Sequence, residues 1–208
     1  MTTIRHVLFD ADGVLQEFPG GFYHEAEQLL GDRTREILAV ASAREHPLLS
    51  GTDDFLPVLA GVLREFDVDV PAADLYAAVW QNIEPSAVSL DLVQRLRDAD
   101  YGVHLGTNQV RRRADHMRAT LPYDELFDVK LYSCDLGVAK PDPAFFQKAA
   151  TRIGADPAAI LFIDDHSPNV EGARSMGMPA VHWRIPEGHD VLLELLAEHG
   201  VAPAGHDA

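Results

Sequence analysis

The chain has 208 residues, of which 47% are hydrophobic and 24% charged, the composition of a folded globular protein rather than a disordered one. Its 33 acidic residues outnumber 17 basic ones, and the formal net charge of -16 disfavours nucleic acid and anionic membranes as partners. The single cysteine, Cys134, excludes an intrachain disulfide and a zinc site built from several cysteines. No apolar run approaches 18 residues and no signal-like segment stands at the N-terminus, so we expect a cytoplasmic protein, either a monomer or a homodimer.

The first predicted element is a short apolar strand at 7–9, and a long segment with helical spacing follows it. This segment predicts helices over 22–30, 33–45, 52–66 and 72–83, with no strand pattern between 16 and 86. From about Pro85 onward, helices and strands alternate. The predicted helices are 90–99, 110–119, 143–153, 168–176 and 189–199, and the predicted strands are 103–105, 129–132, 160–163 and 180–183. Residues 203–208 are expected to be a frayed tail.

Alternation of strands and helices is typical of an α/β domain with a parallel sheet. We therefore predict a three-layer, Rossmann-like α/β core over 1–15 and 87–208, with a small α-helical domain inserted over 16–86. In such a core, ligands bind beyond the carboxyl ends of the strands, and polar clusters follow several of these predicted ends.

Asp10 and Asp12 form the first polar cluster, directly after the strand at 7–9. Two residues apart on extended backbone, their carboxylates project to the same side, where each raises the pKa of the other unless a cation is near. The pair therefore indicates a metal site, or a nucleophile beside a general acid/base. An acidic turn is an equally good explanation of this feature taken alone.

Asp164 and Asp165 form a second acid pair, at the end of the most apolar predicted strand. Carboxylate oxygens suit Mg²⁺, which takes one or two of them together with water and substrate phosphate. The alternative is that Asp165 or Ser167 caps the following helix, which would account for one polar residue but not for two adjacent acids.

Three further residues lie at or soon after predicted strand ends. Thr107 and Asn108 offer a hydroxyl and an amide at a helix start, suited to an anion or to simple capping. Lys140 precedes Pro141 on a loop, where its ammonium could neutralise a carboxylate or a phosphate. Read singly, each of the three is better explained by a structural role.

The order of these clusters resembles the haloacid dehalogenase superfamily of hydrolases. Four motifs carry the resemblance across most of the core: Val7-Leu8-Phe9-Asp10-Ala11-Asp12-Gly13-Val14, Thr107-Asn108, Lys140-Pro141-Asp142-Pro143, and Ile163-Asp164-Asp165. The segment 16–86 lies where the family carries a helical cap. Ala11 and Val14 depart slightly from the family pattern, without removing a catalytic group.

The resemblance implies a Mg²⁺-dependent phosphatase acting on a small phosphorylated metabolite, such as a sugar phosphate. Asp10 would be the nucleophile that forms an aspartyl phosphate, and Asp12 the general acid/base. Thr107, Asn108 and Lys140 would bind the phosphoryl group. Mg²⁺ would be held by Asp10, the backbone carbonyl of Asp12, Asp165 and, as a further candidate, Asp164. An acid at position 12 favours phosphate ester hydrolysis over dehalogenation.

Other activities use similar residues. A phosphomutase or phosphotransferase of the same family would retain Asp10 but pass phosphate to an acceptor other than water, and a haloacid dehalogenase is less favoured. A phosphorylatable receiver module carries its acid pair after the first strand and its phosphoacceptor on a later one, and has no insertion of this size. An inactive binding protein with the same fold is the other non-enzymatic alternative.

Overall fold

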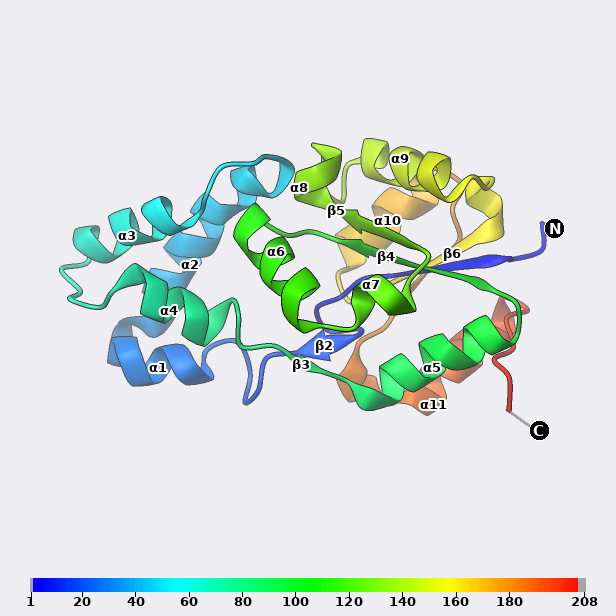
Figure 1. Cartoon of the computed structure of the whole chain (residues 1–208), viewed down its shortest axis with the longest axis horizontal. Coiled ribbons are helices and arrows are strands. Elements are labelled where there is room, and N and C mark those ends of the chain that lie inside the picture. The colour runs from blue at the N-terminus through cyan, green and yellow to red at the C-terminus, as the bar shows by residue number, and fades with distance from the viewer. Residues whose placement is uncertain (1, 206–208) are drawn as a thin grey trace.

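The computed structural model describes residues 2–205 and has a parallel five-stranded sheet at its centre (Figure 1). The strand order is β5-β4-β1-β6-β7. Its strands are β1 (His6–Phe9), β4 (Gly102–Thr107), β5 (Val129–Tyr132), β6 (Ile160–Asp164) and β7 (Ala180–His182). The chain runs outward from β1 through β4 to β5 and then returns to the other side of β1, so the carboxyl end of β1 lies where a ligand is expected.

Helices cover both faces of the sheet and complete the predicted three layers. One face packs against α5 (Ala87–Asp98), α6 (Arg111–Thr120), α7 (Tyr123–Leu126) and α11 (His189–Glu198). The other packs against α8 (Ser133–Leu136), α9 (Pro143–Ile153) and α10 (Ser167–Ser175). Because both faces are covered, the strands are almost continuously apolar and buried, as in other parallel sheets.

The inserted helices form a separate hydrophobic cluster at the end of the molecule opposite the N-terminus (Figure 1). They are α1 (His24–Leu30), α2 (Thr34–Glu45), α3 (Leu56–Glu65) and α4 (Ala72–Val79). Their core is rich in aromatic rings, and those of Tyr76 and Trp80 stack 5.6 Å apart. Short 3₁₀ turns follow α1 and α2, at Gly31–Arg33 and His46–Ser50, and two more occur in the core at Pro157–Ala159 and Ile185–Glu187.

Two very short strands connect this insertion to the core. β2 (Gln16–Glu17) and β3 (Glu84–Pro85) pair antiparallel, so the two connections lie side by side. The expectation that no strand interrupts 16–86 is therefore wrong. A two-residue strand has too few residues to show alternation, and it exists because the outgoing and returning chains meet here.

The expected frayed tail is also only partly correct. Pro203 is buried, and Arg95 binds the backbone carbonyl of Ala204 through its Nε at 2.7 Å, which holds the chain against α5. Residues 206–208 of that expected tail lie outside the described part of the chain. Within residues 2–205, no helix combines the length and the apolar character needed to cross a membrane.

Candidate active site

Four segments bring the predicted site residues to the carboxyl edge of the sheet. Asp10 follows β1, Thr107 ends β4, and Asp164 ends β6. Lys140 comes from the loop between α8 and α9. Parallel strands all end at the same edge, so residues more than 150 positions apart in sequence lie together there.

Lys140 is the centre of this arrangement. Its side chain is 1% exposed, and its Nζ lies 2.8 Å from Asp10 Oδ1 and 2.6 Å from Asp164 Oδ2. Burial raises the pKa of the Asp10 carboxyl, and the Lys140 ammonium opposes that rise. The two neighbouring carboxylates outweigh the effect of burial on Lys140, so its pKa is raised and it stays protonated.

Asp164 and Asp165 are adjacent but have different surroundings. Asp164 is fully buried and also accepts hydrogen bonds from the backbone N–H of His166 and from Asn169 Nδ2. Asp165 is only partly buried, and no hydrogen bond reaches its carboxylate from residues 2–205. The structure therefore does not support a helix-capping role for Asp165.

The carboxylates of Asp10, Asp164 and Asp165 have oxygens that all lie within 4.8 Å of one another. Burial, followed by the charges of Asp164 and Asp12, raises the pKa of Asp165 to about 6. A cluster of hard oxygen donors whose ionisation is disfavoured by mutual repulsion fits a divalent cation such as Mg²⁺. Gly13 permits this packing, because a Cβ there would lie 2.4 Å from Asp165 Oδ2.

Asp12 lies apart from this cluster, in a network of donors. Arg113 binds both of its oxygens, with Nη1 2.5 Å from Oδ2 and Nη2 2.8 Å from Oδ1. Gln16 and Gln109 each donate one further hydrogen bond, at 2.8 and 3.0 Å. Although burial acts in the opposite direction, Arg113 and the two glutamines hold the pKa of Asp12 below its usual value.

Thr107 and Asn108 lie at the site but are used differently. The Thr107 hydroxyl accepts a hydrogen bond from Gln109 Nε2 at 2.9 Å, which leaves its own hydrogen free to donate. Both ends of the Asn108 amide bind the backbone of Lys140, with Nδ2 donating to the carbonyl at 2.8 Å and Oδ1 accepting from the N–H at 2.9 Å. Asn108 thus fixes the loop that carries Lys140.

A cavity of about 440 Å³ opens beside the acids. It is lined by Asp12, Gly13 and Asp165 from the core, and by the connections to the insertion at 17–21 and Glu84. Asp12, Asp165 and the connections to the inserted helices therefore face the same space.

The comparisons with known proteins agree with this geometry. The model of the haloacid dehalogenase-like hydrolases matches residues 4–177. The chain belongs to this family. The resemblance read from the four motifs is confirmed, and the chain is a hydrolase of the haloacid dehalogenase type.

Individual relatives cover nearly the whole chain. Phosphatase MT3486 of Mycobacterium tuberculosis is 31% identical over 192 residues, which are 86% of each protein. Pyrophosphatase PpaX of Bacillus cereus is 25% identical over 88% of this chain and 85% of its own length. A haloacid dehalogenase family enzyme of Bacteroides thetaiotaomicron, solved with magnesium and inorganic phosphate, has a TM-score of 0.74 at 22% identity, over 91% of this chain and 98% of that one.

Sequence reasoning missed the residues that hold Asp12 in this haloacid dehalogenase-like site. Gln109 lies just before α6, and Arg113 is the third residue of that helix. Their position directly after Thr107-Asn108 was the available signal. Gln16 gives no such signal, because only the paired connections to the insertion bring it to Asp12.

Proposed function

We propose that this protein is a Mg²⁺-dependent phosphatase that hydrolyses a small phosphorylated metabolite through an aspartyl phosphate on Asp10. The observation that carries the proposal is the Lys140 ammonium between Asp10 and Asp164, with Asp165 beside them and Asp12 two residues from Asp10. The relatives named phosphatase and pyrophosphatase support a phosphate ester as substrate.

In the first step, the free oxygen of Asp10 would attack phosphorus. A bond forms between that oxygen and phosphorus, the bond to the leaving oxygen breaks, and Asp12 gives that oxygen a proton. Ala11 N–H donates to Asp10 Oδ1 at 2.7 Å and Lys140 binds the same oxygen, which leaves Oδ2 free for the attack.

In the second step, water would attack the phosphorus of the aspartyl phosphate. Asp12, now a carboxylate, takes a proton from the water, and the bond between phosphorus and Asp10 breaks. Inorganic phosphate leaves and Asp10 is regenerated. The Thr107 hydroxyl and the Lys140 ammonium would donate to phosphoryl oxygens in both steps.

Asp10 and Asp165 would hold Mg²⁺ through their carboxylates and Asp12 through its backbone carbonyl, with Asp164 held beside them by Lys140. When bound, the ion would neutralise charge on the phosphoryl group and on the acids. The solved relative from Bacteroides thetaiotaomicron, with magnesium and phosphate together, supports this assignment.

The substrate should be small. The cavity beside the acids holds about 440 Å³ and is bordered by the connections to the inserted helices, which leaves room for a compact leaving group. With a net charge of -16, the protein can accept a phosphate anion only because Lys140 and a bound cation reverse the local field. We propose that the inserted helices act as a cap that selects the leaving group.

Phosphate release from 4-nitrophenyl phosphate, with Mg²⁺ and again with excess chelator, tests this function. We expect Mg²⁺-dependent turnover in the unmodified protein, and none with Asp10→Asn, because the variant lacks the nucleophile. Circular dichroism checks that the variant is folded. A folded Asp10→Asn protein that hydrolyses the ester at the normal rate would exclude Asp10 as the nucleophile.

A further inference from the structure

Asn108 directly follows β4, and its side chain bonds to a distant segment of the chain. Nδ2 donates to the backbone carbonyl of Lys140 at 2.8 Å, and the Lys140 N–H donates to Oδ1 at 2.9 Å. A residue on a neighbouring antiparallel strand bonds in the same way to the N–H and the carbonyl of its partner. The planar amide therefore fixes the backbone of Lys140 on both sides of its Cα.

The residues that follow Lys140 are held by other elements. Gly172 on α10 lies so close to the carbonyl of Pro141 that a Cβ at position 172 would be 2.3 Å from that oxygen. Asp142 accepts a hydrogen bond from the next helix, α9, at its start. Within residues 2–205, by contrast, the Asn108 amide is the only hydrogen-bond partner of the Lys140 backbone.

The position of this backbone decides where the Lys140 ammonium can reach. Nζ lies buried between Asp10 Oδ1 and Asp164 Oδ2, at 2.8 and 2.6 Å. A lysine side chain is a flexible four-carbon stem, so a shift of its Cα either moves the charge or bends the stem. In an active site, a misplacement of about 1 Å can cost about 10²-fold in rate.

We propose that Asn108 is a positioning residue, which holds the Lys140 backbone so that the ammonium lies where both Asp10 and the phosphoryl group can meet it. The inference rests on the proposed phosphatase function and deepens it, since it assigns Asn108 to Lys140 and not to the phosphoryl group. The Asn108 Oδ1 is an acceptor and does not bind a phosphoryl oxygen, and the Lys140 carbonyl already uses one N–H of Nδ2.

The test compares Asn108→Ala with the unmodified protein in two measurements. The first is kcat on 4-nitrophenyl phosphate with Mg²⁺, per folded molecule, which we expect to fall about 10–100-fold. The second is the rate at which acetic anhydride labels Lys140, followed by mass spectrometry. Lys140 should label at least about fivefold faster, because two hydrogen bonds that hold its backbone are lost. The other two lysines of the chain, Lys130 and Lys148, should label at unchanged rates.

Asp156→Ala is the matched control. Asp156 also binds a loop N–H, that of Ala158 at 2.9 Å, but it precedes β6 at the amino edge of the sheet, so its loss should change neither measurement. A merely structural role of Asn108 would lower the melting temperature and leave both kcat per folded molecule and the labelling of Lys140 unchanged. A direct contact with the phosphoryl group would lower kcat without faster labelling. Either result would overturn the inference.

A second variant reaches the same loop from α10. If Asn108→Ala does not fold, Gly172→Ala must show the same loss of kcat and the same faster labelling of Lys140, because the new Cβ would displace the Pro141 carbonyl. Faster labelling with normal kcat would show that the position of Lys140 does not limit the reaction, and would also overturn the inference. If the unmodified protein hydrolyses no phosphate ester, the proposed function fails, and this inference with it.

Discussion

Asp165 is the acid of the site whose surroundings favour a bound cation most directly. Burial and the charges of Asp164 and Asp12 raise its pKa to about 6, and the Lys140 ammonium only partly offsets them. In the unfolded chain its pKa is near the ordinary 3.8, so above pH 6 the ionised carboxylate makes the folded state less stable, by up to about 3 kcal/mol. A bound Mg²⁺ would remove this penalty.

Asp165→Asn should therefore have opposite effects on metal binding and on stability. We expect Mg²⁺ affinity to fall by more than the about 10–100-fold typical of changes to outer partners of a metal site. Without Mg²⁺, the free energy of unfolding at pH 7.5 should stay the same or rise, because a destabilising charge is lost. Calorimetric titration with Mg²⁺ and denaturant unfolding measure the two quantities.

Asp91→Asn is the control for this pair of measurements, because Asp91 is an exposed acid on α5 away from the site. It should alter neither quantity. If the acid pair served only to cap a helix, Asp165→Asn would keep its Mg²⁺ affinity, because asparagine caps a helix about as well as aspartate. That result would contradict the assignment of Asp165 to the metal.

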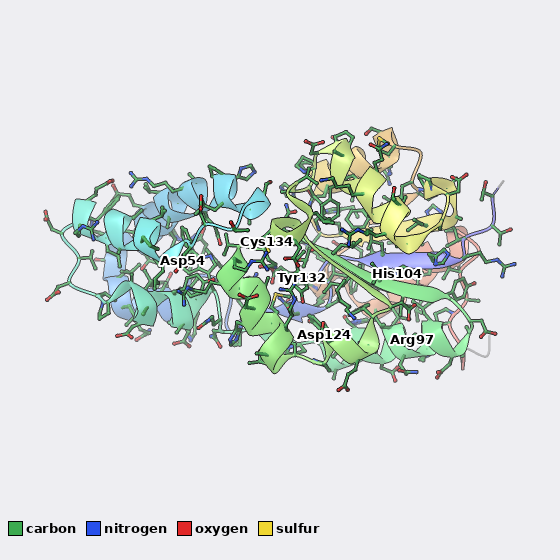
Figure 2. The ribbon with its side chains drawn as sticks, turned by 45° about the horizontal axis from the view of Figure 1, so that its top comes forward. Asp54, Arg97, His104, Asp124, Tyr132 and Cys134 are labelled. Carbon is green, nitrogen blue, oxygen red and sulfur yellow. The ribbon has the colours of Figure 1, made fainter. Side chains whose placement is uncertain are left out.

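At the scale of elements, β1 and β4 carry a pair of histidines, of which His104 is buried and His6 is partly buried. His6 Nδ1 lies 3.1 Å from His104 Nε2, and His104 is labelled on β4 in Figure 2. Burial, then the neighbouring His6, lower the pKa of His104 to about 4, against the opposing charge of Asp128. Between pH 6.5 and 4 the unfolded chain therefore binds a proton that the folded protein does not, so stability falls as pH falls.

We predict that this pair contributes about 2 kcal/mol to the loss of stability between pH 7.5 and pH 5. His104→Gln should reduce the pH-dependent loss by roughly that amount, whatever it costs at pH 7.5, because the ionisable group has gone. Denaturant unfolding at both pH values gives the difference. His46→Gln, at an exposed histidine of the insertion, should leave the pH dependence unchanged. Parallel loss in His104→Gln and the unmodified protein would contradict the prediction.

The turn that leads from β2 to α1 depends on a glycine. Gly21 N–H donates to the Phe18 carbonyl at 2.7 Å, and Gly20 has a φ of +72°, as expected after Pro19 in a type II turn. A Cβ at position 20 would lie 2.7 Å from the ring of His24, whereas one at position 21 would meet open space. Both glycines have positive φ, but only Gly20 is also sterically restricted.

Gly20→Ala should therefore destabilise the protein more than Gly21→Ala. The conformational strain alone costs about 1–2 kcal/mol at either position, and the contact with His24 adds to it at position 20. Thermal unfolding of the two variants, each with its rate on 4-nitrophenyl phosphate, measures both stability and the effect on the connection. Equal melting temperatures would show that His24 moves aside freely.

The sequence predicts the elements of the core well, because their patterns are long or strongly apolar. The helix at 143–153 and the strand at 129–132 have the predicted bounds, and the four motif clusters do meet at one sheet edge. The contact between Arg113 and Asp12 could not be predicted from the sequence, because the two residues lie 101 positions apart and the contact depends on how α6 is oriented. The two-residue strands at 16–17 and 84–85 were not predicted for a related reason, because their pairing forms only when the fold brings the two segments together.

At the scale of the whole molecule, α6 is where the core meets the inserted helices. Arg112 binds Asp54 with Nε and Nη2 at 2.9 and 2.6 Å, and the next residue, Arg113, binds the backbone of Trp80. Asp54 is labelled on the insertion in Figure 2. The exposed pair can open at little cost, because surface ion pairs contribute about 0–1 kcal/mol. If the insertion moves as a unit, this is the boundary that must open.

If the insertion opens and closes during turnover, fixing it in the observed position should stop catalysis. We predict that Asp54→Cys/Arg112→Cys, joined by a short bis-maleimide, loses most of its activity towards both glycerol phosphate and 4-nitrophenyl phosphate, because substrate cannot enter and phosphate cannot leave. Cys134 is buried, so the two new thiols are the accessible ones. The same variant capped with a monofunctional maleimide is the control and should keep its activity. Mass spectrometry confirms the cross-link. A cross-linked protein that turns over both esters as fast as the capped control would show that the insertion is a static part of the fold, and that the substrate reaches Asp10 without any opening at this boundary.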